Sequence, residues 1–404
     1  MAEHPTEAVD RPASPREAPL CEVLAREPEA ADLTRAEAAH RYLQTPQALV
    51  PGNRVTLLHD GVEAYPRMLA AIAAARESVK LETYIFADDT IGRMFGEALV
   101  EAARRGVEVT VLYDAFGSWS SRRHFFQSLR REGVKLAAFS PLRPWQWRLL
   151  SRRDHRKLLV IDGRRAFVGG VNIADCWAPR GECGGWRDDV LELEGPAAAG
   201  LDGLFRATWR SQCHEQLGHF HDRRPRGDVG IGVVAARRAI HQAYLHAINR
   251  ARESVLISAC YFVPDHKILQ ALRRARRRGV EVSLVLAGKS DMRAVMFAGR
   301  AFYDRLLRWG VSIYEWSDVV LHSKTAVVDG VWATVGSFNL DRWSLFNNHE
   351  LNLVFADRRA AKRLVDSFRA DCGRCLPITR DGWRRRPFHA KALEKLCYLF
   401  RRWL

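Results

Sequence analysis

Three blocks of this 404-residue sequence occur twice in the same order, which limits the chain to folds built from two similar halves. The first block, ARESVKLETYIF at residues 75–86, returns as ARESVLISACYF at residues 251–262. The second, AARRGVEVTVLYD at residues 102–114, returns as ARRRGVEVSLVLA at residues 275–287. Repetition of this kind indicates a duplicated structural unit whose two copies pack against each other.

Both pairs of blocks show helices alternating with buried strands. Amphipathic helices are predicted over residues 65–75 and 240–251, and each leads into an apolar strand within the first block. Second helices are predicted over residues 91–105 and 268–278; a glycine ends each one, and the strand of the second block follows. This alternation is typical of α/β layers with parallel strand pairing.

A third block adds a hairpin to each half. HRKLLVIDGRRAFVGGVN at residues 155–172 returns as HSKTAVVDGVWATVGSFN at residues 322–339. In both copies an Asp-Gly pair separates two apolar runs, which predicts a tight antiparallel turn. We therefore predict an α/β fold with a mixed sheet in each of two pseudo-symmetric half-domains, packed face to face with the active site at their interface.

The predicted halves span residues 46–215 and 228–376, because the polar stretch around residues 214–228 breaks the pattern. Residues 1–45 form an N-terminal tail: the first 30 are rich in Pro, Ala and Glu and are predicted to be disordered, with a short helix around residues 33–43. Residues 377–404 form a basic, amphipathic C-terminal segment.

The third block repeats polar residues as well as apolar ones. A structural repeat needs only its apolar positions, so it gives no reason to repeat His, Lys, Asp and Asn; their repetition indicates shared chemistry. The spacing is H-x-K-x4-D, with Asn seventeen residues after the histidine. The two sets are His155, Lys157, Asp162 and Asn172 in the first half, and His322, Lys324, Asp329 and Asn339 in the second.

These residue types fit the transfer of a phosphodiester. On a strand, His and Lys two positions apart project to the same side. One neutral imidazole can attack phosphorus and carry it as a phosphohistidine, while a second, protonated one gives its proton to the leaving alkoxide. Lysine and asparagine side chains then surround the non-bridging oxygens, where charge develops. This chemistry needs no cofactor, and the single CxxC formed by Cys372 and Cys375 gives no reason to expect a metal site.

The twin motif resembles the phospholipase D superfamily, over about residues 50–375. The resemblance implies that both motifs face one cleft, with His155 and His322 as nucleophile and acid/base; His155 is favoured as the nucleophile. It also implies that Lys157, Lys324, Asn172 and Asn339 bind phosphate, whereas Asp162 and Asp329 pin the turns.

The resemblance further implies an acid that orients each histidine by accepting from its second ring nitrogen and so fixes its tautomer. The candidates are Asp188 in WRDDV and Glu350 in NNHEL. Asp189 competes with Asp188 for this role, and Glu350 has an alternative interpretation as a surface acid at a helix start.

Within the superfamily the chain is most similar to bacterial cardiolipin synthases, particularly the B-type without membrane spans. The segments ETYIFADD, GGVNIAD, WRDDVLELEGP, CYFVPD and GSFNLDRWSLFNNHE carry this likeness. It implies transfer of a phosphatidyl group between two phosphatidylglycerol molecules, giving cardiolipin and glycerol. The alternatives are a hydrolytic phospholipase D, transfer to serine or ethanolamine, and a nuclease of the same superfamily.

The charge of the chain favours an anionic partner. Its net charge is +16, and because residues 1–45 carry nine acids and five bases, the remainder carries about +20. Such a surface attracts lipid phosphates or nucleic acid; nucleic acid is not expected, because the related nucleases commonly have one short repeat that dimerises. The expected partners are anionic phospholipids, namely phosphatidylglycerol with phosphatidylethanolamine as a second candidate donor, and the membrane surface. No obligate protein partner is inferred.

The sequence predicts peripheral attachment at the cytoplasmic face of the bacterial inner membrane. It contains no run of about 18 apolar residues for a membrane span and no secretory signal at its start. Two segments mix aromatic and basic residues as interfacial segments do: residues 141–153, with Trp145 and Trp147, and residues 383–404. The alternatives are a packed loop for the first and a helix docked on the protein's own core for the second.

Overall fold

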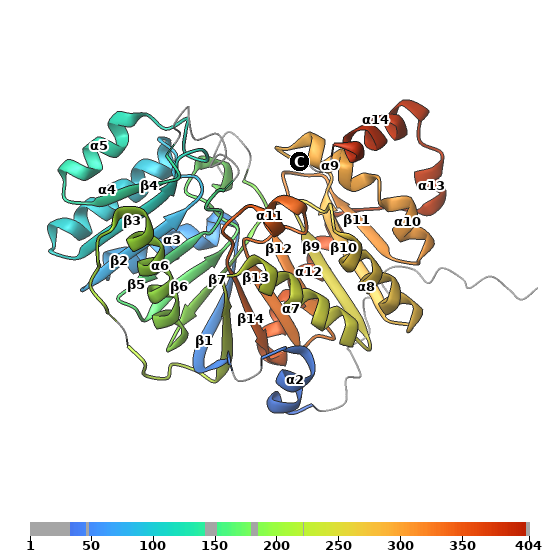
Figure 1. The fold of residues 1–404 in the computed structure, drawn as a ribbon, viewed down its shortest axis with the longest axis horizontal. Helices are drawn as coiled ribbons and strands as arrows, with labels where there is room; N and C mark the ends of the chain where they lie inside the picture. The colour runs from blue at the N-terminus through green and yellow to red at the C-terminus, as the bar shows by residue number, and fades with distance from the viewer. Residues whose placement is uncertain (1–32, 46–47, 142–151, 179–184, 221, 401–404) are drawn as a thin grey trace, which may run out of the picture.

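The computed structural model describes residues 33–45, 48–141, 152–178, 185–220 and 222–400. Two similar halves lie side by side, each a mixed sheet flanked by helices (Figure 1). The disorder predicted for the first 30 residues and the tryptophan-containing part of the 141–153 segment fall outside the described residues. The α/β fold with two related half-domains is confirmed.

The first half has a parallel core followed by an antiparallel hairpin. Strands β2, β3 and β4 pair in parallel, whereas β5 pairs antiparallel with β2 and then with β6. The strands are β1 (Val50–His59), β2 (Ser78–Thr83), β3 (Glu108–Asp114), β4 (Lys135–Phe139), β5 (Leu158–Ile161), β6 (Arg165–Gly169) and β7 (Asp189–Glu194). The helices are α3 (Asp60–Ala73), α4 (Thr90–Arg104), α5 (Arg123–Arg131), α6 (Ala197–Cys213) and the 3-10 turn η3 (Asp175–Trp177).

The second half repeats this plan, with β9, β10 and β11 in parallel and the hairpin β12–β13 antiparallel beside β9. Its strands are β8 (Val229–Val234), β9 (Ser254–Ala259), β10 (Glu281–Ala287), β11 (Ser312–Trp316), β12 (Lys324–Val328), β13 (Trp332–Gly336), β14 (Asn352–Ala356) and β15 (Leu376–Pro377). Its helices are α7 (Arg237–Arg250), α8 (His266–Arg277), α9 (Arg293–Arg300), α10 (Tyr303–Arg308), α11 (Arg342–Phe346), α12 (Arg358–Arg374), α13 (Arg380–Arg384) and α14 (Phe388–Leu399).

The four helices predicted from the repeated blocks are present, with ends within a few residues of prediction except for the start of α3, five residues earlier. A short helix, α2 (Arg35–Tyr42), also forms where it was expected. Its N-cap Thr34 accepts from the backbone N–H of Glu37, and the Glu37 side chain accepts from the backbone N–H of Thr34, a capping box that fixes where the helix begins.

Both predicted hairpins turn at their Asp-Gly pairs. Asp162 and Gly163 have φ angles of 50° and 60°, and Asp329 and Gly330 have 52° and 63°. Two consecutive positive φ angles define a type I′ turn, whose twist matches that of the flanking strands. The turn residues therefore set the register of β5 with β6 and of β12 with β13.

The two halves are joined more closely than two packed domains. Strand β8 pairs with both β1 and β14, so that in the described residues fifteen strands form one continuous sheet. Pairing removes the open edges that each half-sheet would otherwise expose. Helices α6 and α12 contribute to a core shared by both halves, in which Leu201 and Phe205 of the first belong to the same cluster as Leu364 and Phe368 of the second. The predicted face-to-face packing is thus supplemented by an edge-to-edge junction.

Both His-x-Lys motifs lie at one edge of the sheet. Strands β2, β3, β9 and β10 all end at this edge, which we call the carboxyl edge. Strands β5 and β12 run the opposite way and begin there, since Leu158 pairs with Glu82 and Lys324 with Ala259. The residues just before β5 and β12 therefore meet at the carboxyl edge of both halves.

Candidate active site

The two motif histidines lie at the carboxyl edge, each held by the main chain of the other half. The N–H of His155 donates to the carbonyl of His349 (3.0 Å), and the N–H of His322 donates to the carbonyl of Arg187 (2.7 Å). Both side chains are buried. These crossed backbone bonds bring residues that are 167 positions apart to one place, as the motif interpretation requires.

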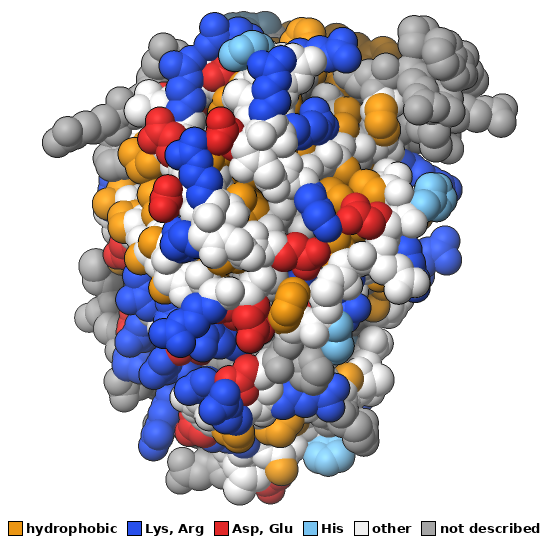
Figure 2. All heavy atoms as spheres, turned by 90° about the vertical axis from the view of Figure 1, so that its left-hand side faces the viewer, with side chains coloured by type: hydrophobic (Ala, Val, Ile, Leu, Met, Phe, Trp, Pro, Cys, Tyr) orange, Lys and Arg blue, Asp and Glu red, His pale blue; other side chains and the backbone are white. Residues whose placement is uncertain are grey.

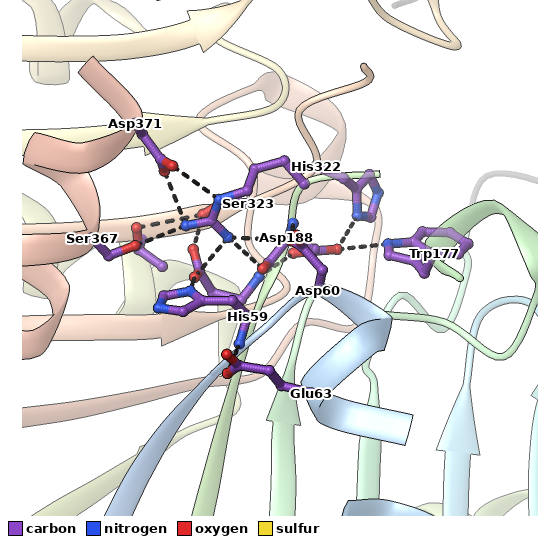
Figure 3. A network of polar contacts seen from close by, with 12 residues as sticks. His59, Asp60, Glu63, Trp177, Asp188, His322, Ser323, Ser367 and Asp371 are labelled. Carbon is purple, nitrogen blue, oxygen red and sulfur yellow. Dashed lines mark hydrogen bonds and ion pairs between the residues drawn. The ribbon is translucent and has the colours of Figure 1, made fainter. Parts of the chain in front are cut away.

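Each histidine also contacts a carboxylate from the opposite half. The Nδ1 of His155 lies 3.1 Å from both carboxylate oxygens of Glu350. The Nδ1 of His322 lies 2.7 Å from Oδ2 of Asp188, the contact drawn in Figure 3. A carboxylate at Nδ1 leaves Nε2 to face a substrate. Glu350 is fully buried, so it is not a surface acid.

Asp189, the competitor of Asp188, has a different set of partners. Its carboxylate accepts from Ser323 Oγ (2.5 Å) and from the Arg187 guanidinium (2.9 Å), and it lies 3.0 Å from Nδ1 of His59. No hydrogen bond in the described part of the structure joins it to His155 or His322. The geometry thus favours Asp188 as the orienting acid, with Asp189 behind it.

The two orienting acids differ in size, and the equivalent residues that contact them, Gly170 and Ser337, differ accordingly. A Cβ at Gly170 would come within 2.1 Å of the Asp188 carboxylate, so this position requires glycine. Its counterpart Ser337 instead donates to Glu350. The hairpin blocks end in GGVN and GSFN, and their second residue therefore differs according to which carboxylate it contacts.

The two lysines repeat one arrangement. Nζ of Lys157 donates to the carbonyl of His155 (2.6 Å), and Nζ of Lys324 donates to the carbonyl of His322. Burial lowers the pKa of Lys157 to about 7, with the charge of Lys324 adding to the effect and that of Glu350 opposing it. Two buried lysine side chains, near enough for the charge of Lys324 to lower the pKa of Lys157, form a site for an anion.

The histidines share this electrostatic environment. Burial and then the charge of Lys157 lower the pKa of His155. Burial, followed by the charges of Lys324 and Lys157, holds the pKa of His322 well below its usual value. The negative charge of a phosphodiester bound here would oppose the effect of the lysine charges and so favour protonation of an imidazole.

The orienting acids respond differently to burial. Burial raises the pKa of Asp188 to about 6, while Lys324 opposes the rise. Burial also acts against ionisation of Glu350, but the neighbouring His155 and the hydrogen bonds to the carboxylate lower its pKa overall. Glu350 is therefore the more firmly ionised of the two at neutral pH.

The motif asparagines are buried beside the histidines. Oδ1 of Asn172 accepts from the N–H of Ile85 (3.0 Å), which leaves its amide NH2 to face a ligand. Oδ1 of Asn339 is buried and has no hydrogen-bond partner among the described residues. A buried polar group without a partner, at the edge of a charged cleft, is typical of a ligand site.

The motif aspartates lie at the far ends of their hairpins. Asp162 accepts from the backbone N–H groups of Glu77 (2.8 Å) and Ser78 (3.0 Å). Asp329 likewise accepts from Glu253 and Ser254, both at 2.8 Å. These carboxylates tie the hairpin turn to the start of β2 or β9, which favours the structural role implied by the resemblance.

Arg187 organises a network behind Asp188 (Figure 3). Its guanidinium donates to both oxygens of Asp371 (3.1 and 2.9 Å) and to Ser367 Oγ (2.8 Å), both from α12 of the second half. The N–H of Asp188 donates to Asp60 at the start of α3 (2.7 Å). Residues of both halves thus hold the segment that carries Asp188.

Sequence reasoning missed the aromatic residues around the histidines. The ring of Tyr84 lies 5.3 Å from that of His155 and also 5.3 Å from Nζ of Lys157. The rings of Trp177 and Trp186 lie 5.3 and 5.5 Å from His322, and the indole N–H of Trp177 donates to Asp188 (2.9 Å). Comparing the repeats could have flagged Tyr84, because Cys260 occupies its place in the second half.

Comparison with known proteins places this geometry in a family. The family model described as "Cardiolipin synthase, PLD-like domain" matches residues 68–178 and 244–372, which include both motifs. The chain belongs to this family. It is 34% identical to the major cardiolipin synthase ClsA of Bacillus subtilis over 360 residues, covering 86% of this chain and 74% of that protein. It is also 34% identical over 380 residues to a cardiolipin synthase of a Geobacillus strain, covering 90% and 74%.

Solved structures show the same fold at lower identity. Phosphatidylserine synthase from Haemophilus influenzae matches 91% of this chain and 98% of its own, with a TM-score of 0.65 and 12% identity. Polyphosphate kinase from Porphyromonas gingivalis matches 87% of this chain with a TM-score of 0.55 and 15% identity. The predictions of a phospholipase D-like enzyme and of the phosphatidyltransferase class are confirmed by the family assignment.

The described residues provide neither a membrane span nor a metal-binding cluster. None of the helices there has the length and apolar character to span a bilayer. Nor do the described residues include a group of three or more His, Cys, Asp or Glu side chains placed to hold a metal ion.

Proposed function

We propose that the protein transfers a phosphatidyl group from one phosphatidylglycerol to the glycerol headgroup of a second, forming cardiolipin and releasing glycerol. One observation carries the proposal: two histidines from two halves meet, each with Nδ1 on a buried carboxylate and with a lysine beside it. The names of the related proteins support the choice of reaction within the superfamily.

The first half-reaction forms a phosphohistidine. Nε2 of His155 attacks phosphorus, and the bond from phosphorus to the oxygen of the donor's headgroup glycerol breaks. That oxygen takes the Nε2 proton of His322, so free glycerol leaves. Lys157, Lys324 and the two asparagine amides stabilise the charge that builds on the non-bridging oxygens. Glu350 stabilises the positive charge that develops on His155 as it attacks.

The second half-reaction reverses these roles. His322, now neutral, takes the proton of a glycerol hydroxyl on a second phosphatidylglycerol. The resulting oxygen attacks phosphorus, the P–N bond to His155 breaks, and cardiolipin leaves. Asp188 stabilises the imidazolium form of His322 at this step and at the start of the cycle.

The chain's charge supports a lipid setting for this reaction. With a net charge of +16 it is attracted to anionic phospholipid, so we propose attachment to the cytoplasmic face of the bacterial inner membrane. The proposed donor is phosphatidylglycerol, with phosphatidylethanolamine as a second candidate. Residues 46–215 and 228–376 are the proposed half-domains, flanked by the tail at 1–45 and the segment at 377–404.

Product analysis tests the function. Purified protein is incubated with vesicles of headgroup-labelled phosphatidylglycerol, and the lipids and released glycerol are quantified. We expect cardiolipin and glycerol in equal amounts; phosphatidic acid as the main product would identify a hydrolase instead.

Two substitutions test the mechanism. His155→Ala and His322→Ala should each reduce turnover to background, because attack and leaving-group protonation are both required. His266→Ala, at an exposed position of α8, is the matched control and should leave turnover unchanged. Full activity in either motif variant would rule out the two-histidine mechanism, and peptide mapping of a trapped adduct should locate the phosphatidyl group on His155.

A further inference from the structure

Loops at the carboxyl edge expose large hydrophobic side chains. After β3, Phe116 and Trp119 are 52% and 75% exposed, and Met292, after β10, is 48% exposed. Phe346, at the end of α11 and four residues before Glu350, is 45% exposed. The loop that carries Trp119 also lies close to the candidate site, because Ser118 Oγ donates to the carbonyl of Tyr84 (3.2 Å) and the ring of Tyr84 lies 5.3 Å from that of His155.

Helix α14 adds an apolar face on the same side of the molecule. In Figure 1 it lies with α9 at the top, the side of α5 and α11, whereas α2 lies at the bottom. One face of α14 docks on the protein: the ring of Tyr398 packs 5.2 Å from that of Phe302, and Glu394 pairs with Arg386. Its other face leaves large side chains exposed, namely Phe388, Leu393, Leu396, Leu399 and Phe400. The sequence left two interpretations of residues 383–404, an interfacial helix or a helix docked on the protein's own core. Each of them describes one face of α14.

Basic side chains accompany these hydrophobic groups. The guanidinium of Arg342 lies 4.8 Å from the ring centre of Phe346. That of Arg153, near Phe116, is buried and paired with Asp114, so it supports the loop rather than the surface. Lys391 and Lys395 belong to α14. In the side view of the first half, Lys and Arg side chains are spread from the top to the bottom of the molecule, so the basic charge alone does not mark one side (Figure 2). Aromatic rings with adjacent cations are the combination that favours a headgroup region containing anionic lipid.

The opposite edge lacks this character. It is formed by the two Asp-Gly turns and by the ends of α4 and α8, where Arg104, Arg164 and Arg277 are exposed. Among the described residues, no exposed large hydrophobic side chain lies at those turns. In the described part of the chain, the exposed hydrophobic side chains named above therefore gather on the side of the molecule on which the histidines lie. Val62, Met94 and Leu376 are the other large hydrophobic side chains that are exposed there.

We propose that this rim, made of Phe116, Trp119, Met292, Phe346 and the apolar face of α14, seats the protein on an anionic phospholipid bilayer with the cleft facing the headgroups. The inference rests on the proposed function, since it explains how a phosphodiester reaches His155 and His322 while its acyl chains stay in the bilayer. Insertion of the rim side chains excludes water from the lipid surface, and the neighbouring Arg and Lys side chains pair with phosphates.

Vesicle binding tests the rim separately from the chemistry. Wild type and Trp119→Ser/Leu399→Ser are sedimented with phosphatidylglycerol vesicles, and turnover of short-chain phosphatidylglycerol is measured in detergent micelles. We expect vesicle affinity to fall at least tenfold while micellar turnover stays within twofold. Trp119→Phe is the matched control and should bind as wild type, because it keeps an aromatic side chain.

A depth measurement gives a second readout. Brominated acyl chains quench the fluorescence of tryptophans that reach them. If Trp119 inserts into the bilayer, such vesicles should quench less fluorescence in Trp119→Phe than in wild type. Unchanged sedimentation and unchanged quenching in a protein that still makes cardiolipin would overturn the rim. Wild-type protein that binds vesicles but forms no cardiolipin in micelles would instead overturn the proposed reaction, without contradicting the proposed role of the rim.

Discussion

Replacing Glu350 by glutamine is the sharpest test of how the first histidine is controlled. The substitution keeps the size of the side chain and an oxygen that can accept from Ser337, but removes the negative charge beside Nδ1 of His155. An amide can also turn its NH2 toward Nδ1, which forces the proton onto Nε2 and blocks attack on phosphorus. The fold should survive, because Glu350→Gln removes a fully buried charge rather than creating one.

The size of the effect follows from the contact. A hydrogen bond to a charged group contributes about 1.5–3 kcal/mol, which corresponds to about a 10- to 150-fold loss in kcat. The wrong tautomer adds to this, and an acid-to-amide change behind a catalytic histidine lowers kcat by about 10⁴-fold in serine proteases. We therefore expect kcat for Glu350→Gln to fall between about 10²- and 10⁴-fold.

The assay is initial-rate cardiolipin formation from labelled phosphatidylglycerol in micelles, with thermal unfolding measured on the same samples. Glu192→Gln is the matched control: Glu192 is a buried carboxylate in β7 whose partner is Arg67 rather than a histidine. It should keep wild-type kcat. A kcat for Glu350→Gln within threefold of wild type, in a folded protein, would falsify the assignment of Glu350 to His155.

Four further outcomes are expected. Burial lowers the pKa of Lys157 to about 7, so this side chain loses its charge as the pH rises through 7, and kcat/KM should fall on the alkaline side. In Lys157→Arg the side chain stays charged, so the alkaline fall of kcat/KM should occur at least one pH unit higher. Asp329→Ala removes the acceptor of the partly buried N–H groups of Glu253 and Ser254 and should cost about 1–3 kcal/mol in chemical denaturation, and Asp329→Asn less. Arg187→Met removes the charge partner of the Asp189 and Asp371 carboxylates and should destabilise the fold by about 3–5 kcal/mol. Stability equal to wild type would show that this network does not hold the two halves together. EDTA should leave turnover intact in the micelle assay, and inhibition reversed by added Mg²⁺ would contradict a reaction run by histidines alone.

The sequence predicted the local parts of the site because each depends on spacing along one segment. The Asp-Gly pairs fix the hairpin turns through their positive φ angles, and this places His155 and His322 at the starts of equivalent strands. Alternating helices and strands gave the parallel pairing. These features need no knowledge of how the halves meet.

The contacts between the two halves could not be predicted from the sequence pattern. The pairing of His155 with Glu350 and of His322 with Asp188 depends on crossed backbone hydrogen bonds that form only when the two halves join. The junction through β8 was also missed, because an apolar six-residue strand gives no sign of pairing with two different halves. Residues such as Trp177 were invisible because their importance lies in what they contact.

Duplication made the two halves equivalent in backbone, but their histidines ended in unlike surroundings. His155 faces Tyr84 and a firmly ionised Glu350. His322 lies against two tryptophans and Asp188, whose own pKa is raised by burial. A symmetric pair would bind phosphate equally well from either side and give no preference for which imidazole attacks. The differences at Tyr84 and Cys260, and at Gly170 and Ser337, break that symmetry. The proposed reaction requires such an asymmetry, because it assigns one histidine to hold the phosphatidyl group and the other to move the proton.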